Sequence, residues 1–560
     1  MKHRRIRAMF DLTRYSSPVV VRSWGSLLAA ALMILVACTP SSPPPAAETP
    51  EAMVTGAEKG DPIPWFEGTV EEAFALAKQE RKPVFLYWGA VWCPPCHVLR
   101  TKLFTRPDFQ ARLAATVPVY LDGDTERAQI WGEKLHTLGY PTVIIFDADG
   151  NEVTRIESAL PYEEYAAALT RALEVDRPFA ELLAAARDGG AAALTPAELG
   201  LLASHAWGQD ETSGLDRAAR QALFARLREE TPAAQRDVKA RFLALELEAL
   251  SEAGKGAAGA KLSAKQRAAL LAALDELLAD PALRRANLDL LLYRAPGVIA
   301  LLTPEAGAER TALAGRWEAA ARAVEEDASL PTTDRLSALW PQLALAAPDG
   351  EDAAVPAALQ ERVRERIRWA SGLEHGEEET QALLNTMAGL LERAGLAGEA
   401  KELLTAHLAE ALAPYYYTSW LAGLEAREGN PAAAVALYRQ AWQGARERSS
   451  GAAMTPFRWG SSYLQQLMKL TPEAQAELAA DARIVLDDLL ASPDAFSHGN
   501  WARLQSLAGA LTEWQGSDPG RASVVAAIRA QVAARCGELP ATGDDSAAAR
   551  CRGLFASAAS

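Results

Sequence analysis

Two patterns of hydrophobic and polar residues alternate between about residue 62 and residue 176. A continuous apolar run at 83–88, rich in aromatic and β-branched residues, predicts a buried central strand. Further strands are predicted at 117–121, 142–146 and 152–156. Helical spacing predicts helices at 71–80, from residue 94 to about 113, at 126–136 and at 162–173. Alternating strands and helices of this kind predict an α/β domain with a central sheet.

Beyond residue 176 the pattern becomes helical throughout. The chain is rich in Ala, Leu, Glu and Arg at helical spacing and has few β-branched runs, so 177–560 is predicted to be almost entirely α-helical. Thr195 and Ser263 each open a capping-box sequence, which marks the start of a helix. The predicted fold class is therefore an α/β domain followed by a large all-α domain.

A 34-residue repeat occurs within this helical region, near 381–442. The segment Ala388-Gly389-Leu390 recurs as Ala422-Gly423-Leu424, and Gly395 recurs as Gly429. This period, with small residues where paired helices approach each other, resembles that of tetratricopeptide repeats. The resemblance implies a helical solenoid with a concave face that binds a protein partner.

Four aromatic residues in the second unit allow two interpretations: Tyr415, Tyr416, Tyr417 and Trp420. They line the concave face, or they fill the core between helices. Large aromatic side chains are buried in most proteins, so core filling is the favoured interpretation.

The first 61 residues indicate the cellular compartment of the protein. A basic stretch precedes a short apolar run at 27–37 that ends in Leu35-Val36-Ala37-Cys38. This segment resembles the lipobox of bacterial lipoproteins, which implies a signal peptide at 1–37 and acyl chains on Cys38. An uncleaved anchor helix and a plain signal peptide are the alternatives. The proline-rich, polar stretch at 38–61 is predicted to be a disordered tether. The signal segment and the lipobox resemblance imply export, with the lipid-anchored protein facing the periplasm of a bacterial cell.

Composition bounds the remaining possibilities. The chain has 560 residues, more than a single hydrophobic core normally serves, so at least two folding units are expected, at 62–176 and 177–560. A hydrophobic fraction of 49% and a charged fraction of 23% are ordinary for a globular protein. The net charge of −15 argues against a nucleic-acid partner, because phosphate binding needs clustered basic residues.

The motif Trp92-Cys93-Pro94-Pro95-Cys96 follows the predicted central strand directly. A cysteine at the start of a helix faces unsatisfied backbone N–H groups, which favour its thiolate. Cys96 lies one helical turn later and is placed to resolve a mixed disulfide formed at Cys93. Pro94 and Pro95 stiffen the loop, and Pro95 suits a first helical turn. The pattern predicts a redox-active cysteine pair with Cys93 as the nucleophile.

The cysteine pair allows three other interpretations. A purely structural disulfide is disfavoured, because such bonds rarely join cysteines three residues apart at a strand-to-helix junction. A copper or zinc pair lacks a second pair of ligands nearby. Attachment of c-type haem matches the sequence Cys93 to His97 but requires a different surrounding fold. No cofactor and no metal are therefore predicted.

The cysteine motif, together with Tyr140-Pro141-Thr142 before a later strand, resembles the thioredoxin family. The resemblance implies that Pro141 follows a cis peptide bond beside the two sulfurs, and that the Tyr140 backbone pairs with a client chain. Trp92, Pro94 and Pro95 would then support the active site. One position departs from the family pattern, because Tyr87 stands where thioredoxin has a buried carboxylate. The direction of the redox reaction therefore stays open.

Two functions follow from this resemblance. The first is a lipid-anchored disulfide oxidoreductase whose partners are client proteins with thiols or disulfides, together with an envelope redox partner. The second is a binding scaffold in which the thioredoxin fold is only structural. Retention of both cysteines and of the Tyr-Pro pair favours the oxidoreductase.

A second cysteine pair lies near the C-terminus. Cys536 and Cys551 enclose fifteen steps of chain, so in an oxidising compartment a structural disulfide is expected. The alternative is that this pair is itself a target of the redox domain.

Overall fold

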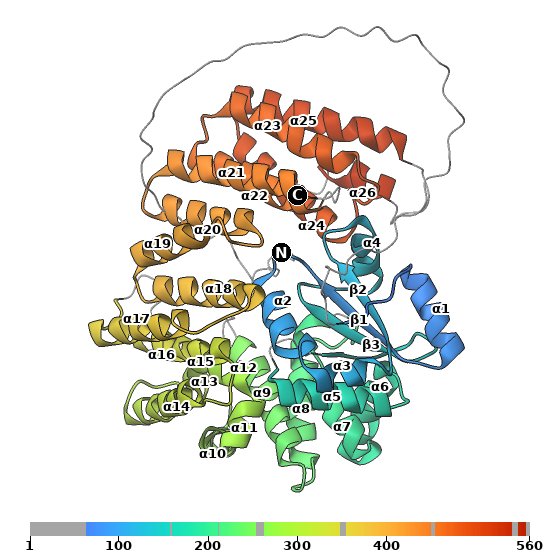
Figure 1. Cartoon of the computed structure of the whole chain (residues 1–560), viewed down its shortest axis with the longest axis vertical. Coiled ribbons are helices and arrows are strands. Elements are labelled where there is room, and N and C mark those ends of the chain that lie inside the picture. The colour runs from blue at the N-terminus through green and yellow to red at the C-terminus, as the bar shows by residue number, and fades with distance from the viewer. Residues whose placement is uncertain are drawn as a thin grey trace.

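The fold is described by a computed structural model (Figure 1). The described residues are 63–156, 160–210, 212–253, 262–347, 354–449, 454–539 and 547–555. The predicted signal peptide at 1–37, the lipidation at Cys38 and the tether at 38–61 lie outside these ranges and stay predictions. Within the described ranges, no helix is both long and apolar enough to cross a bilayer.

A four-stranded mixed sheet forms the first part of the structure. Its strands are β1 (Val84–Gly89), β2 (Val117–Asp122), β3 (Thr142–Phe146) and β4 (Glu152–Ile156), in the spatial order β2-β1-β3-β4. Strand β1 runs parallel to β2 and antiparallel to β3, which forms a hairpin with β4. Every residue of β1 is buried, since helices cover both faces of this central strand.

Helices pack on both faces of the sheet. They are α1 (Val70–Glu80), α2 (Pro94–Leu99), the π-helical turn η1 (Arg100–Phe104), α3 (Pro107–Leu113), α4 (Glu126–Lys134) and α5 (Tyr162–Glu174). On one face Ala73 and Ala77 of α1 pack with Leu86 of β1. On the other face the core includes Phe109 of α3 and Tyr165 of α5. The alternation of strands and helices predicted from the sequence is confirmed.

The single helix predicted to run to about residue 113 is wrong. The chain instead forms α2 and η1, breaks at Thr105 and Arg106, and starts again at α3 with Pro107. Arg106 is extended, with φ −85° and ψ 124°. Proline disfavours a helical conformation in the residue before it and fits the first turn of a helix, so Pro107 ends one helix and begins the next.

The rest of the described chain is helical, as predicted, apart from turns and a bridge in which His205 pairs with Ile156 of β4. The first group of helices is α6 (Phe179–Gly189), η2 (Gly190–Ala193), α7 (Pro196–Ser204), η3 (Trp207–Gln209), α8 (Arg217–Glu230), α9 (Arg236–Ala253), α10 (Ala264–Ala279), α11 (Pro281–Ala286), α12 (Leu288–Tyr293) and α13 (Ala295–Leu302). The second group is α14 (Ala308–Glu326), α15 (Thr332–Ser337), α16 (Leu339–Ala346), α17 (Ala357–Ser371), α18 (Glu377–Arg393) and α19 (Ala397–His407). The last group is α20 (Pro414–Arg427), α21 (Pro431–Arg448), α22 (Met454–Leu470), α23 (Gln475–Leu490), α24 (His498–Gln515), α25 (Pro519–Glu538) and α26 (Ala547–Gly553).

These helices curve around the sheet. They begin beside α5, pass along one side of the molecule and return above the sheet, so that α24 and α26 lie near α4 (Figure 1). Helix α18 packs on α2, and α24 packs on α4. Helices distant in sequence therefore meet the end of the sheet that carries the cysteine motif.

The predicted repeats correspond to the helix pairs α18–α19 and α20–α21. Ala388 and Ala422 occupy equivalent positions and are both fully buried. Gly395 and Gly429 follow the first helix of each pair with φ of 76° and 82°, which a residue with a side chain rarely adopts. The two units share these features, and their assignment to the tetratricopeptide family stays a prediction.

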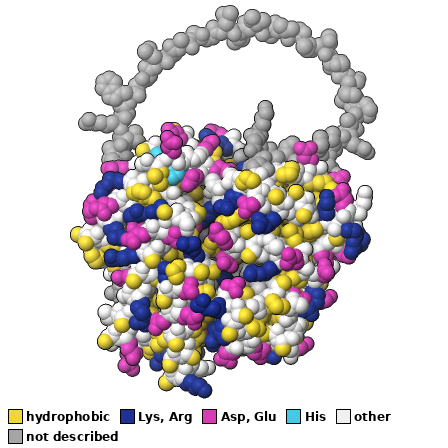
Figure 2. Space-filling view, turned by 60° about the horizontal axis from the view of Figure 1, so that its bottom comes forward, with side chains coloured by type: hydrophobic (Ala, Val, Ile, Leu, Met, Phe, Trp, Pro, Cys, Tyr) yellow, Lys and Arg dark blue, Asp and Glu magenta, His cyan; other side chains and the backbone are white. Residues whose placement is uncertain are grey.

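Charges are mixed over the surface of the molecule. On the face drawn in Figure 2, basic and acidic side chains are interspersed with hydrophobic ones. This face therefore presents no continuous basic footprint of the kind that a nucleic acid requires.

Candidate active site

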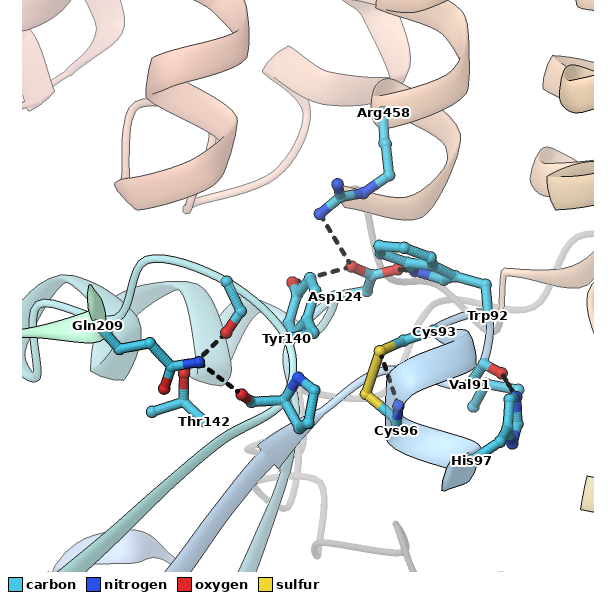
Figure 3. The surroundings of a disulfide bond; sticks show 12 residues. Val91, Trp92, Cys93, Cys96, His97, Asp124, Tyr140, Thr142, Gln209 and Arg458 are labelled. Carbon is cyan, nitrogen blue, oxygen red and sulfur yellow. Dashed lines mark hydrogen bonds and ion pairs between the residues drawn. A yellow bond between two sulfur atoms is a disulfide. The ribbon is translucent and has the colours of Figure 1, made fainter. Parts of the chain in front are cut away.

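Cys93 and Cys96 are joined in a disulfide at the junction between β1 and α2 (Figure 3). Strand β1 ends at Gly89, and the backbone N–H of Cys93 donates to the carbonyl of Ala90 at 3.1 Å. This turn places Cys93 as the N-cap of α2. The disulfide therefore lies between the end of a buried strand and the N-terminus of the helix that follows it.

The two prolines determine which N–H groups surround the sulfurs. Pro94 and Pro95 occupy the first two positions of α2 and have no N–H to donate. The first available donor is the backbone N–H of Cys96, which lies 3.2 Å from the Cys93 sulfur and 3.0 Å from its carbonyl oxygen. A donor in this position stabilises a thiolate at Cys93 once the disulfide is reduced.

Tyr140 and Pro141 lie beside this junction and are joined by a cis peptide bond. The Tyr140 ring packs against the same apolar cluster as the two cysteines, and its centroid lies 5.4 Å from that of Trp92. Thr142 begins β3 immediately afterwards. The structure thus brings the two sequence motifs, about fifty residues apart, to one end of the sheet.

Asp124 is the polar centre of the site. It is 3% exposed and follows β2. Its carboxylate accepts hydrogen bonds from the Trp92 indole N–H at 2.6 Å and from the Tyr140 hydroxyl at 3.2 Å (Figure 3). It also accepts one from the Thr455 hydroxyl and lies 3.9 Å from the Arg458 guanidinium, both from α22. Asp124 is absent from the site residues predicted from the sequence, although its place just after a predicted strand is a usable signal.

Comparison with known proteins supports this geometry. Residues 70–173 match the family model of the thioredoxin-like domain. The chain is also similar, with 37% identity over 81 residues, to the thiol:disulfide interchange protein DsbD of Cronobacter sakazakii. The proteins of the same name from Yersinia enterocolitica and Vibrio vulnificus are 39% identical over 82 residues and 34% identical over 105 residues. Each match covers 14% to 17% of this chain and the same share of the relative.

The thioredoxin-like domain carries an aromatic cluster around Tyr87, the position at which the sequence departs from thioredoxin. Tyr87 is 1% exposed, stacks on Tyr120 with centroids 5.3 Å apart and meets the edge of Phe104 at 5.1 Å. Proton transfer to or from Cys96 is therefore not assisted by a carboxylate at this position.

From the sequence alone, His97 is either a solvent-facing helix residue or a cation that favours the thiolate. The structure shows neither arrangement. The ring is buried, because α18 packs over α2, and its Nε2 atom lies 2.8 Å from the Val91 carbonyl oxygen. Burial lowers the pKa of His97 to about 4, so the ring is neutral at pH 7.

Helices from the far end of the chain enclose the disulfide. Cys93 is 2% exposed and Cys96 is 1% exposed, within an apolar cluster that includes residues of α18, α20 and α22. Trp92 is stacked with Tyr416 at 6.3 Å and meets Trp459 edge-on at 5.2 Å. The tyrosines of α20 are therefore buried, as the core-filling interpretation expected, and one of them packs against the thioredoxin-like domain.

The second cysteine pair is also bonded. A disulfide joins Cys536 of α25 to Cys551 of α26. Arg550, next to Cys551, forms an ion pair with Glu133 of α4 in the thioredoxin-like domain. This disulfide thus fixes a helix that contacts the domain carrying the first pair.

Proposed function

We propose that this chain is a thiol-disulfide oxidoreductase that acts on protein cysteines through Cys93 and Cys96. The observation that carries the proposal is the Cys93–Cys96 disulfide at the N-terminus of α2, with the Cys96 N–H directed at the Cys93 sulfur. The similarity of residues 70–173 to the thioredoxin-like domain, and the partial similarity of the chain to thiol:disulfide interchange proteins, support it. Each of these relatives is matched over only 14% to 17% of its length, so clients and partners are part of the proposal.

The reaction proceeds by two thiol-disulfide exchanges. In the reduced chain, the Cys93 thiolate attacks one sulfur of a client disulfide, and the other client sulfur leaves as a thiolate. The Cys96 thiolate then attacks Cys93 in this mixed disulfide, which forms the Cys93–Cys96 bond and releases the second client thiol. Two electrons pass from the chain to the client, and the same steps in reverse oxidise a client dithiol.

The neighbouring residues position this chemistry. Trp92 and Tyr140 hold Asp124 and border the disulfide, while Pro94 and Pro95 leave the Cys96 N–H as the first donor to the sulfur. We assign to Pro141 the role of presenting the backbone before β3 to a client chain. The packing of Trp92 and Tyr140 with the apolar cluster that contains both cysteines supports these roles.

We infer a location in the bacterial cell envelope. Lipid attached to Cys38 would anchor the chain and leave residues 62–560 facing the periplasm, where client proteins and an envelope redox partner are available. In this arrangement, the helical region at 177–560 binds or selects the partner.

Trapping tests the function directly. A Cys96→Ala form of the full chain, expressed in the envelope, lacks the resolving thiol, so a client attacked by Cys93 stays covalently attached. Non-reducing electrophoresis and mass spectrometry should identify proteins bonded to Cys93. The matched control carries Cys93→Ala as well and should trap nothing. Equal recovery from the two forms would contradict the proposal.

One observation favours a second candidate function. Both sulfurs are nearly inaccessible, as expected of a structural disulfide in a scaffold that binds proteins without exchanging electrons. In that case the Cys93–Cys96 bond resists reduction even after the surrounding helices are loosened, whereas a redox-active pair becomes reducible.

A further inference from the structure

The helices that surround the disulfide cover the surface to which a protein client would have to bind. We call α18, α20, α22 and α24 the covering helices; they lie around α2 and α4 (Figure 1). Thiol-disulfide exchange requires the attacking sulfur to approach along the S–S bond. With Cys93 and Cys96 at 2% and 1% exposed, a folded client cannot make that approach.

The contact between α22 and the cysteine motif is specific and polar as well as apolar. The Arg458 guanidinium lies over the Trp92 ring at 4.3 Å and faces the Asp124 carboxylate at 3.9 Å (Figure 3). The Thr455 hydroxyl donates to the same carboxylate. Asp124 thus joins Trp92 and Tyr140 of the thioredoxin-like domain to two residues of α22. Loss of either α22 contact weakens the closure without touching a cysteine.

A second set of contacts holds α24 against α4. The backbone N–H of Gly499 donates to the Gln129 side chain at 3.0 Å, and that of His498 donates to Glu133 at 3.3 Å. The His498 ring also lies 3.1 Å from the Thr137 hydroxyl. Gln129 and Glu133 lie on α4, and Thr137 lies in the loop that leads to Pro141.

A third set of contacts holds the other side of the motif. Arg100, in the turn that follows α2, pairs with Glu378 of α18 at 2.7 Å. Lys102 pairs with Asp334 of α15 at 2.5 Å, and both side chains are largely buried. Segments more than 200 residues away in sequence therefore contact the region around the disulfide on several sides.

We propose that the chain rests in a closed, autoinhibited form, in which its own covering helices block Cys93 and Cys96, and that separation of α22 from Asp124 admits the client. This inference rests on the proposed exchange function. The Asp124 contacts act as the latch, so Thr455 and Arg458 are positioning residues that control access and take no part in the electron transfer. The covering helices and a protein client compete for one surface.

Access of reductants to the disulfide tests the latch. Thr455→Val keeps the shape of the side chain and removes its hydrogen bond to a buried carboxylate, while Arg458→Met keeps an unbranched apolar stem and removes the charged guanidinium. Each change should speed reduction of Cys93–Cys96 by about tenfold or more. Thr455→Val removes a hydrogen bond to the Asp124 carboxylate and Arg458→Met removes the charge that faces it, and both contacts exist only in the closed form. The control is Thr303→Val. The buried Thr303 hydroxyl donates to the Ile299 carbonyl four residues earlier, so its loss leaves the contacts with α22 intact.

The measurement uses the oxidised full-length chain, a small dithiol (dithiothreitol) and a reduced thioredoxin as reductants. Alkylation followed by peptide mass spectrometry reports Cys93–Cys96 separately from Cys536–Cys551. The acceleration should be larger with the protein reductant, which needs the wider opening, and Thr303→Val should match the parent chain. Circular dichroism should show unchanged helix content in each variant.

The outcomes separate this inference from the proposed function. If the parent chain is reduced by thioredoxin as fast as the Thr455→Val and Arg458→Met forms, the closed state does not limit access and the inference is wrong. If both variants are reduced faster but never pass electrons to a protein disulfide, the latch stands and the oxidoreductase function fails.

Discussion

Replacing Asp124 with asparagine removes a negative charge from the point where α22 meets the thioredoxin-like domain. The carboxylate accepts from three donors, Trp92, Tyr140 and Thr455, and faces Arg458 at 3.9 Å with only 4% of the Asp124 side chain exposed. The asparagine oxygen has two lone pairs, so at least one donor loses its partner. The Arg458 charge loses its counter-charge as well.

The expected cost follows from these contacts. A hydrogen bond to a charged group contributes about 1.5–3 kcal/mol, and removing one partner of a buried ion pair costs about 3–5 kcal/mol. Because the two effects overlap, Asp124→Asn should lower the free energy of unfolding by about 3–5 kcal/mol. The exposed pair Asp275–Arg316 provides the control, and Asp275→Asn should cost less than about 1 kcal/mol.

A double-mutant cycle isolates the contact with α22. Urea unfolding, followed by tryptophan fluorescence, would be measured for Asp124→Asn, Arg458→Met and the double variant. The coupling energy should be about 1–3 kcal/mol, as found for residues in direct contact. A coupling below about 0.5 kcal/mol would refute the assignment of Asp124 as the link between the two parts of the chain.

Four further predictions concern single features. Cys93 should react with an alkylating agent faster than the second cysteine of its motif, with a pKa below that of an ordinary thiol; the reverse order, measured as rate against pH, would show the roles to be exchanged. Cys38→Ser should abolish lipid labelling and release the chain from the membrane fraction. The buried, neutral His97 has its pKa lowered from 6.5 to about 4, so folding stability should fall as the pH drops from 6.5 towards 4. His97→Gln should lessen that fall, which acid titration of unfolding would measure. Replacing both Cys536 and Cys551 by serine should lower stability by about 3 kcal/mol in thermal unfolding, given a sequence separation of 15.

The sheet and the cysteine motif could be predicted from sequence because their signals are local. Strands β3 and β4 have the bounds that the apolar runs predicted, 142–146 and 152–156. A buried strand followed directly by a helix that begins with Cys-x-x-Cys can be recognised from one short run of consecutive residues. The break before Pro107 was also legible, since a proline disfavours helix in the residue before it, whereas the π-helical turn at Arg100–Phe104 has no comparable sequence signal.

The packing of the covering helices over Cys93 and Cys96 could not be predicted from the sequence. Trp92 and Trp459 lie 5.2 Å apart at their ring centroids but are separated by most of the chain. Periodicity shows that α22 has a buried face without showing what that face buries. The same limit applied to Tyr416, for which core filling and a binding face were both open, and which packs against Trp92. Tertiary contacts of this kind are determined by the path of the whole helical array.

Electron transfer to a protein disulfide is the most direct test of the central claim. The purified full chain, reduced and freed of reductant, would be mixed with insulin, and thiols on both proteins would be counted by alkylation and mass spectrometry. The account predicts that one Cys93–Cys96 disulfide forms for each insulin disulfide broken, faster in Thr455→Val than in the parent chain, and not at all in Cys93→Ala. Insulin disulfides that stay intact with the Thr455→Val chain, while its Cys93 and Cys96 thiols stay reduced, would contradict the account.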